Sequence, residues 1–249
     1  MRDRSAFLKP IAHRGLHDAV KGIIENTLPA FEAAIARGYG IECDVRPAAC
    51  ATPMVFHDLT LERLIEGEGL LAAHEAAALK GFAYRGAGGS MIELSDLLDL
   101  IGGRVPLLIE IKSEWDAPDP RFLQAIAATA GAYRGPIALM SFDPAVMAGI
   151  RALAPHVPRG IVSGLFAGDC WWRGKLGPER AYALTHLLES GPAAPDFYAY
   201  DVNALPTPIT RFVREVLGLP LFTWTVRTEE QRETAARWAD APIFEGYEP

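Results

Sequence analysis

The sequence has few cysteines, no long apolar run and no excess of positive charge. Its 249 residues include only three cysteines, Cys43, Cys50 and Cys170, without the paired spacing of a zinc site. So sparse a set excludes a disulfide-built fold and favours a reducing compartment. No segment approaches the ~20 apolar residues of a membrane span, and no apolar stretch precedes Pro10 as in a secretory signal. We therefore expect a cytoplasmic protein without a transmembrane segment.

The charge balance argues against a nucleic-acid surface. The chain carries 24 lysines and arginines against 31 acidic residues, a formal charge of −7 at pH 7. Proteins that bind nucleic acids present a basic face to the phosphate backbone. A small anionic substrate is still compatible, because a few local cations or a metal ion outweigh the global charge at one site. Half of the residues are hydrophobic, which is enough for a full-sized core.

Short apolar runs with the length of β-strands recur along the whole chain, with helical segments between them. Most successive runs begin 21 to 37 residues apart, the spacing of a strand followed by a crossover helix. Eight such units in 249 residues predict an α/β fold, a (β/α)8 TIM barrel. No linker is visible, so we expect one domain over residues 1–249. The expected strands are Ile11–His13, Ile41–Val45, Leu107–Lys112, Ile137–Ser141, Gly160–Ser163, Phe197–Asp201, Leu221–Val226 and Pro242–Glu245.

One strand-like run interrupts this alternation. Seven residues separate Pro53–His57 from the strand that ends at Val45, whereas a parallel crossover needs a dozen or more. The two runs should therefore form a short antiparallel hairpin. The stretch from about residue 58 to residue 106 is then a small insertion after the second strand.

Charged residues stand in strands that should otherwise be apolar. Glu42 and Asp44 flank Cys43, so the strand period of two places both carboxylates on one face. Glu110 and Lys112 share the inward face of the next barrel strand, where such residues usually belong to an active site. Three converging carboxylates repel one another unless a hard divalent cation lies between them. The alternative is structural: Glu110 and Lys112 form a salt bridge, and Glu42 and Asp44 cap helices.

Two histidines stand at matching places beside these carboxylates. His13 ends the first strand and His57 ends the hairpin strand. Histidine transfers protons near neutral pH, and a pair can divide the acid and base roles. Arg14 offers a planar fork that suits phosphate oxygens, although it could equally form a surface ion pair. Either histidine alone could be structural, and we favour the functional interpretation because both lie at strand ends.

Three further features are candidates with weaker signals. Trp224 lies near the end of a barrel strand and could pack beneath a glycerol or choline-like group, because aromatic faces attract quaternary ammonium. Plain barrel packing is the alternative for this residue. Glu25 and Asn26 belong to the loop after the first strand, and we favour hydrogen bonding that orients the His13 loop over direct metal binding. The Trp171–Trp172 pair should pack or rim the mouth without a chemical role.

The order of these motifs resembles the glycerophosphodiester phosphodiesterase family over essentially the whole chain. Each motif is weak alone, but the combination in this order is highly specific. The motifs are His13-Arg14-Gly15, Glu25-Asn26-Thr27, Glu42-x-Asp44-Val45, His57-Asp58 followed by Leu61 and Arg63, Glu110-Ile111-Lys112, Ser141-Phe142 and Trp224-Thr225-Val226. The departures are the unusual turn 46–53, Leu64 in place of a threonine, and Ile243-Phe244-Glu245 where the family has Ile-Thr-Asp.

The resemblance implies a fold similar to the phosphatidylinositol phospholipase C barrels and the hydrolysis of glycerophosphodiesters to sn-glycerol 3-phosphate and an alcohol. The expected partner is thus a small-molecule glycerophosphodiester. The site residues that the resemblance implies are His13 and His57 as acid and base, Glu42, Asp44 and Glu110 as ligands of Mg²⁺ or Ca²⁺, and Arg14 and Lys112 as phosphate contacts. The head group, the metal and the oligomeric state stay open.

Two other functions are compatible with the same residues. A related enzyme of the lysophospholipase D type, or one acting on glycerophosphoinositol, uses the same chemistry, and a lipid tail needs apolar residues at the mouth. A barrel that binds a phosphodiester or a protein without catalysis is the alternative from another class. The intact set of two histidines and three carboxylates argues against that alternative, because a degenerate relative would normally have lost one.

Overall fold

The sheet closes into a barrel. The computed structural model describes residues 5–86, 89–167, 172 and 174–249. Its strands form one sheet in the order β1-β9-β8-β7-β6-β5-β4-β2-β3, and β1 also pairs with β2. That pairing closes eight parallel strands into a ring and leaves β3 as an antiparallel strand on the outside of β2. The expected TIM barrel with its hairpin is therefore confirmed.

The strand bounds differ from the expected ones by at most two residues. The barrel strands are β1 (Ile11–Ala12), β2 (Gly40–Pro47), β4 (Leu107–Ile111), β5 (Ile137–Ser141), β6 (Arg159–Ser163), β7 (Phe197–Asp201), β8 (Leu221–Val226) and β9 (Ala241–Phe244), and the hairpin strand is β3 (Pro53–Val55). His13, His57, Lys112 and Glu245 therefore lie just beyond the ends of their strands. Loops at the carboxyl ends of barrel strands are where active sites lie in this architecture.

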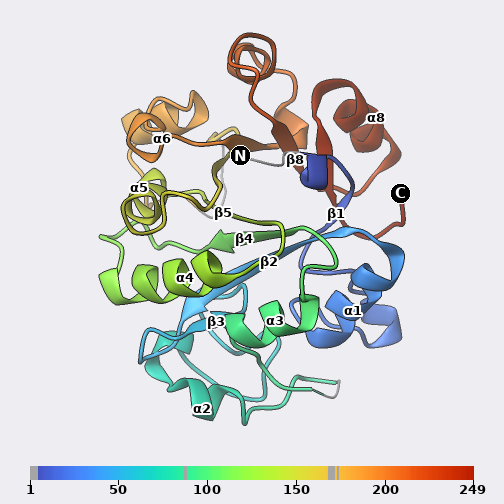
Figure 1. Cartoon of the computed structure of the whole chain (residues 1–249), viewed down its shortest axis with the longest axis vertical. Coiled ribbons are helices and arrows are strands. Elements are labelled where there is room, and N and C mark those ends of the chain that lie inside the picture. Colours follow the sequence, from blue (N-terminus) through green and yellow to red (C-terminus); the bar gives the residue numbers. More distant parts are fainter. Residues whose placement is uncertain (1–4, 87–88, 168–171, 173) are drawn as a thin grey trace.

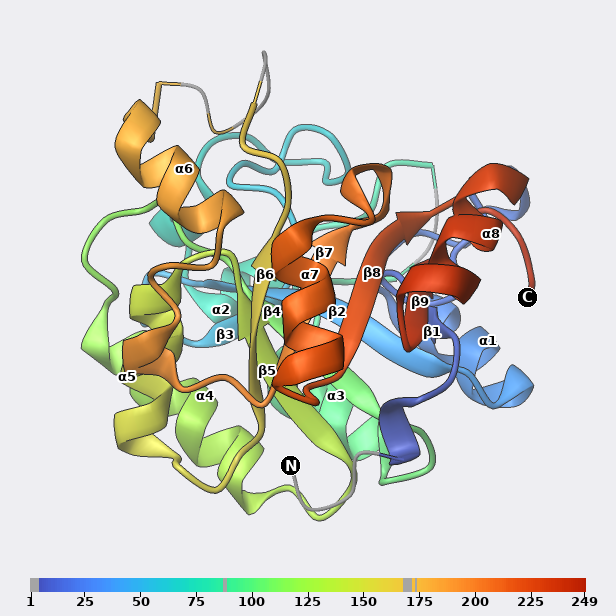
Figure 2. The same ribbon diagram turned by 90° about the horizontal axis from the view of Figure 1, so that it is seen from above.

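Helices surround the strands, as Figure 1 shows from one side and Figure 2 after a quarter turn. They are α1 (Leu28–Arg37), α2 (Ala76–Leu79), α3 (Leu94–Ile101), α4 (Pro120–Ala132), α5 (Pro144–Leu153), α6 (Pro178–Thr185), α7 (Pro208–Arg211), continued by a π-helical turn (Phe212–Val216), and α8 (Glu229–Trp238). Short 3₁₀ turns occur at Ser5–Phe7, Ala19–Lys21, Leu71–Ala73, Gly191–Ala193 and Val202–Ala204. Within the described residues, none of these helices is long and apolar enough to cross a bilayer.

The segment between β3 and β4 forms the expected excursion. It lies beside β3 on the outside of the barrel, drawn in cyan to green in Figure 1. Its alanine-rich part forms only the four-residue helix α2. A small core of its own holds the segment against the hairpin; its buried members include Met54, Phe56, Leu61, Ile65, Tyr84 and Met91. This packing supports the loop that carries His57.

The alternation of side chains along β4 explains where the polar site sits. Ile109 and Ile111 face the helices and belong to the core between barrel and helices. Leu108 faces the lumen and packs in the barrel interior. Glu110 and Lys112 continue that inward face toward the carboxyl end of the strand. The apolar floor of the lumen thus ends where the charged residues begin, at the mouth.

Candidate functional site

Glu42, Asp44 and Glu110 converge at the carboxyl ends of β2 and β4. The parallel register pairs Asp44 with Glu110, and Glu42 precedes Asp44 by two residues on the same strand. One ligand oxygen from each of the three lies within 4.8 Å of the others. The residues are 1%, 1% and 8% exposed, respectively. The structure therefore brings together the three acids that the sequence singled out.

Two cations and one amide hold this acidic cluster. The Lys112 ammonium lies 2.7 Å from Asp44 Oδ1 and 2.5 Å from Glu110 Oε1. Arg14 Nε lies 3.2 Å from Asp44 Oδ2, and Asn26 Nδ2 donates to the same oxygen at 2.9 Å. The salt bridge of the structural alternative is therefore present. Its capping roles are not, because Glu42 and Asp44 lie inside β2.

The charges in the cluster do not balance, since three carboxylates face two cations. Burial opposes ionisation of Asp44, but Lys112 and Arg14 outweigh it and hold the pKa of Asp44 well below its usual range. Burial, reinforced by the charges of Asp44 and Glu110, raises the pKa of Glu42 well above its usual value. Glu42 is therefore the carboxylate that still lacks a counter-charge, and a divalent cation supplies that charge in acidic clusters of this kind.

The turn after β1 contains two consecutive residues in the left-handed backbone region. Arg14 and Gly15 both adopt positive φ, 56° and 78°. A Cβ atom at Gly15 would lie 2.9 Å from the backbone of Ala30, so this position requires glycine. The Arg14 amide donates to Glu42 Oε2 at 3.0 Å, and the Asn26 amide donates to the Arg14 carbonyl at 2.9 Å. These bonds hold the strained turn against the acidic cluster.

His13 is oriented by a carboxylate from the far end of the chain. Its Nδ1 lies 2.7 Å from Oε2 of Glu245, which directly follows β9. Its Nε2 lies 4.0 Å from Glu42 Oε2. Burial lowers the pKa of His13, against the hydrogen bond that its ring donates to Glu245. Burial opposes ionisation of Glu245, but its contacts with His13 and Arg227 together outweigh burial and lower the pKa of Glu245 to about 2. Arg227 also contacts this carboxylate at 2.9 Å.

His57 is oriented by its own neighbour in sequence. Its Nδ1 lies 2.7 Å from Asp58 Oδ1, and its carbonyl accepts a hydrogen bond from Arg46 Nε at 2.6 Å. Burial opposes ionisation of Asp58, but the hydrogen bonds from His57 and Arg63 hold its pKa far below its usual range. Carboxylate contacts to one ring nitrogen fix the tautomer and free the other nitrogen for proton transfer.

Arg63 connects the two halves of the site. Its guanidinium contacts both oxygens of Asp58, at 2.5 and 3.0 Å, and both oxygens of Glu25, at 3.0 and 2.7 Å. Glu25 in turn accepts a bond from Arg14 Nη1 at 2.8 Å. The chain of contacts thus runs from His57 through Asp58, Arg63 and Glu25 to Arg14. As expected, Glu25 and Asn26 orient the first loop by hydrogen bonding.

The aromatic candidates have packing partners. Trp224 is half-buried, packs edge-to-face on Phe142 with ring centroids 5.2 Å apart, and donates from Nε1 to the Ala199 carbonyl. Trp172 packs on Phe166, whereas Trp171 lies outside the described residues. Packing thus accounts for the placement of Trp172 and Trp224.

The cysteines have no connection to the site in the described part of the chain. Cys43 is a buried free thiol and Cys50 an exposed one. Burial raises the pKa of the Cys43 thiol well above its usual value, which disfavours a reactive thiolate. Cys170 lies outside the described residues.

The sequence did not single out two residues that matter to the histidines. Glu245 entered only as a weak match to the family pattern, and Arg63 only as a motif letter. A carboxylate at the end of the last predicted strand was the available signal for Glu245, because that position lies beside the end of the first strand once the barrel closes. His17, whose Nε2 lies 4.0 Å from Glu245 Oε2, was likewise not predicted.

Comparisons with known proteins agree on one family. The model of the glycerophosphoryl diester phosphodiesterase family matches residues 13–244. A glycerophosphodiester phosphodiesterase of Caldanaerobacter subterraneus is 29% identical over 234 residues, which are 90% of this chain and 87% of that protein. Two solved structures have the same fold at 21% identity. One is an Oleispira antarctica phosphodiesterase in complex with the product sn-glycerol-3-phosphate, with a TM-score of 0.73 over 95% of this chain and 92% of that one. The other is a glycerophosphodiester phosphodiesterase from Thermotoga maritima, with a TM-score of 0.69 over 95% and 93%.

Proposed function

The chain belongs to the glycerophosphoryl diester phosphodiesterase family, and from that premise we propose that it hydrolyses glycerophosphodiesters to sn-glycerol 3-phosphate and an alcohol, using a divalent metal ion and two histidines. The observation that carries this proposal is the arrangement at the mouth. Three buried carboxylates meet at the mouth, Asp44 among them interacts electrostatically with both imidazoles, and each imidazole has a carboxylate 2.7 Å from Nδ1. This arrangement provides a candidate site for a metal ion and two imidazoles that can transfer protons.

Glu42, Asp44 and Glu110 would hold the metal. The donor set fits, because it consists of carboxylate oxygens alone and carries more negative charge than Lys112 and Arg14 neutralise. Oxygen-only donors suit the hard ions Mg²⁺ and Ca²⁺. When bound, such an ion supplies positive charge to the phosphoryl oxygens as negative charge develops there.

His13 and His57 divide the proton transfers. One imidazole takes the proton of the attacking hydroxyl, and the other gives a proton to the departing alkoxide. Glu245 and Asp58 hold the two rings by Nδ1, so that Nε2 of each ring is the nitrogen that exchanges the proton. The bond that forms joins the attacking oxygen to phosphorus, and the bond that breaks joins phosphorus to the alcohol oxygen.

Arg14 and Lys112 bind the phosphodiester. Both already lie against the acidic cluster, so their cationic groups are fixed beside the position of the reacting phosphate. A planar guanidinium and a compact ammonium stabilise the charge that grows on the non-bridging oxygens. Trp224 would border the glycerol portion from β8.

The test is release of sn-glycerol 3-phosphate from a panel of glycerophosphodiesters, with Mg²⁺, with Ca²⁺ and with excess chelator. We expect metal-dependent release from the purified chain. Glu42→Gln and Glu110→Gln should abolish release at saturating metal, because each removes a ligand charge from the cluster. Glu68→Gln is the matched control, since Glu68 is an exposed acid of the excursion. Undiminished turnover in the two ligand variants, or in chelator, would contradict the metal assignment.

A further inference from the structure

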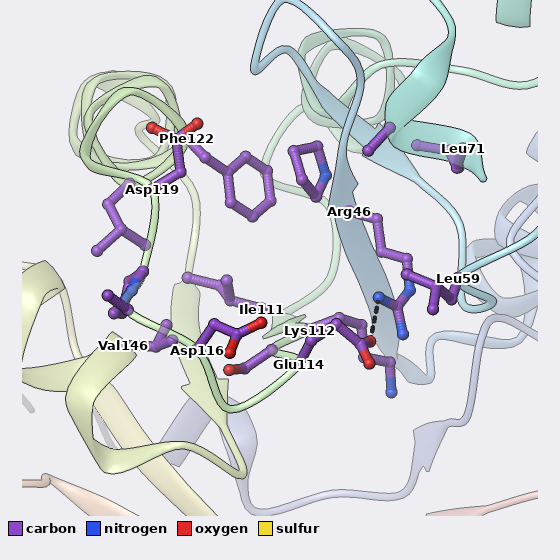
Figure 3. Close-up of a pocket in the computed structure, with 16 residues that line it drawn as sticks. Arg46, Leu59, Leu71, Ile111, Lys112, Glu114, Asp116, Asp119, Phe122 and Val146 are labelled. Carbon is purple, nitrogen blue, oxygen red and sulfur yellow. Dashed lines mark hydrogen bonds and ion pairs between the residues drawn. The ribbon is translucent and has the colours of Figure 1, made fainter. Parts of the chain in front are cut away.

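A cavity of about 220 Å³ borders the candidate site on its His57 side. Figure 3 shows its lining, which comes from the loop after β3, the turn Leu71–Ala73, the loop after β4 and the first turns of α4 and α5. Lys112, which contacts Asp44 and Glu110, belongs to this lining. So does Arg46, which donates to the His57 carbonyl. The cavity therefore shares Lys112 with the acidic cluster and Arg46 with the His57 loop, while its apolar lining lies on the helix-facing side of β4.

The lining of the cavity is mainly apolar. Ile111, Phe122 and Val146 are 1%, 4% and 3% exposed and form one side. Leu59 and Leu71 approach from the excursion on the other side, as Figure 3 shows. Apolar cavities of this kind gain most from an apolar occupant, because water inside them lacks hydrogen-bond partners.

Most charged groups of the lining are already paired. Arg46 Nη1 bonds Glu114 at 2.9 Å, and Lys175 contacts the other oxygen of Glu114. Asp119 caps α4 by accepting from the Arg121 amide at 2.8 Å. Asp116 is exposed at the rim. The charges thus neutralise one another around an apolar interior, which does not favour an ionic occupant.

From this lining we infer that the cavity binds an alkyl chain carried by the alcohol of the substrate. The inference rests on the proposed function and narrows its substrate class to glycerophosphodiesters of apolar alcohols. In a displacement at phosphorus the attacking and leaving oxygens lie roughly in line. The inference takes His57 as the imidazole that protonates the departing alcohol, which places that alcohol on the side of the loop that shares Arg46 with the cavity.

The volume limits the length of that chain. An apolar cavity of ~150 Å³ accommodates benzene, a molecule of six carbons. By that scale, the 220 Å³ of this cavity hold about nine carbons. Longer chains must extend past the rim, where burial no longer grows with length.

The experiment measures kcat/KM for sn-glycero-3-phosphoalkanols from the methyl ester to the hexadecyl ester. Each buried methylene should raise kcat/KM by about fourfold, with a plateau near eight to ten carbons, on the order of the cavity's capacity. A flat series overturns this inference and leaves the proposed function standing. Absence of release from every ester, including glycerophosphoethanolamine, overturns the proposed function instead.

Charge preference is tested with two alcohols of the same shape. Choline and its neutral carbon isostere 3,3-dimethylbutanol differ only in the positive charge. We expect the dimethylbutyl ester to have the higher kcat/KM. A higher value for the choline ester would assign the cavity to a cation beside Asp116 and overturn the inference.

Variants that fill the cavity test its role without altering the reaction centre. Ala72 is an exposed residue of the lining, and its exposed neighbour Ala73 is not part of it. Ala72→Trp should remove the chain-length dependence while the methyl ester keeps its rate to within about twofold. Ala73→Trp is the matched control and should behave as wild type. Ala117→Trp fills the cavity from the opposite rim and replaces Ala72→Trp if that variant is unstable. Unchanged chain-length dependence in both blocked variants overturns the inference.

Discussion

Each of the two histidines of the site contacts a carboxylate, but the two carboxylates come from different parts of the chain. In each, Nδ1 lies 2.7 Å from a carboxylate oxygen. For His57 the carboxylate is Asp58, the next residue, and the pair sits on a loop after the hairpin. For His13 it is Glu245, 232 residues away, brought there by the pairing of β1 with β9. One pair is built by a loop and the other by closure of the barrel.

The surroundings of the two pairs also differ. The side chain of His13 is 13% exposed and that of His57 is 32% exposed. His13 faces Glu42, and its partner Glu245 is also bound by Arg227. Asp58 is bound by Arg63, which is itself 46% exposed. The contact of His13 is therefore buried in the barrel, whereas that of His57 is more open to solvent. This difference predicts different responses to the same substitution.

The largest effect should come from removing either imidazole. His13→Ala and His57→Ala should each reduce kcat by about 10²–10⁴-fold, the usual contribution of acid or base catalysis. Added imidazole should rescue His57→Ala better than His13→Ala, because the His57 position is more open to solvent. Steady-state rates at saturating metal measure both effects. His156→Ala, which removes an exposed histidine outside the site, is the control. Equal rescue of both variants would contradict the proposed difference in access.

The next effect should come from the carboxylate partners. Glu245→Gln and Asp58→Asn should each lower kcat by about 10–100-fold, as expected for groups that orient a functional imidazole. Glu245→Gln should have the larger effect, because His13 is the more buried ring and has less solvent to replace the lost contact. A double-mutant cycle measures the coupling: Glu245→Gln should add little to His13→Ala. Independent, multiplicative losses would show that Glu245 does not act through His13.

A smaller effect is expected at Arg63, which belongs to the open side. Arg63→Ala should lower kcat by about fivefold and leave KM nearly unchanged, since exposed ion pairs contribute modestly. Arg63→Lys should recover little of this loss, because an ammonium cannot span Asp58 and Glu25 as the guanidinium fork does. The control is Arg211→Ala, which breaks an exposed pair between the end of α7 and Glu215 of the following π-helical turn. A rise in KM alone would assign Arg63 to substrate binding instead.

The smallest effect should appear in the pH dependence of stability. The pKa of Glu245 in the folded chain is lowered to about 2, so its contribution to the free energy of unfolding is present above its ordinary pKa. That contribution is lost as the pH falls from about 4.5 toward 2. Urea unfolding of wild type and Glu245→Gln, with chelator present, should therefore differ most near pH 6 and converge as the pH approaches 2. A difference that stays constant between those pH values would contradict this assignment.

Much of the fold could be predicted because its signals are local. Strand length, spacing and the apolar face of each run gave eight barrel strands to within two residues. The seven-residue separation of Val45 and Pro53 gave the antiparallel hairpin for a simple steric reason. The alanine-rich part of the excursion was less predictable. It forms only the 3₁₀ turn Leu71–Ala73 and the four-residue helix α2, because tertiary packing against the hairpin, not helix propensity, decides its conformation.

The sequence alone determined which residues share a face: the period of two placed Glu42 beside Asp44, and adjacency placed Asp58 beside His57. Only the tertiary structure decided the partner of His13, because a contact across 232 residues depends on barrel closure and leaves no local pattern. The same holds for Arg63 and for the apolar cavity, whose lining residues come from separate loops and helices. Local periodicity fixes the direction of a side chain, whereas its partners depend on which segments closure brings together.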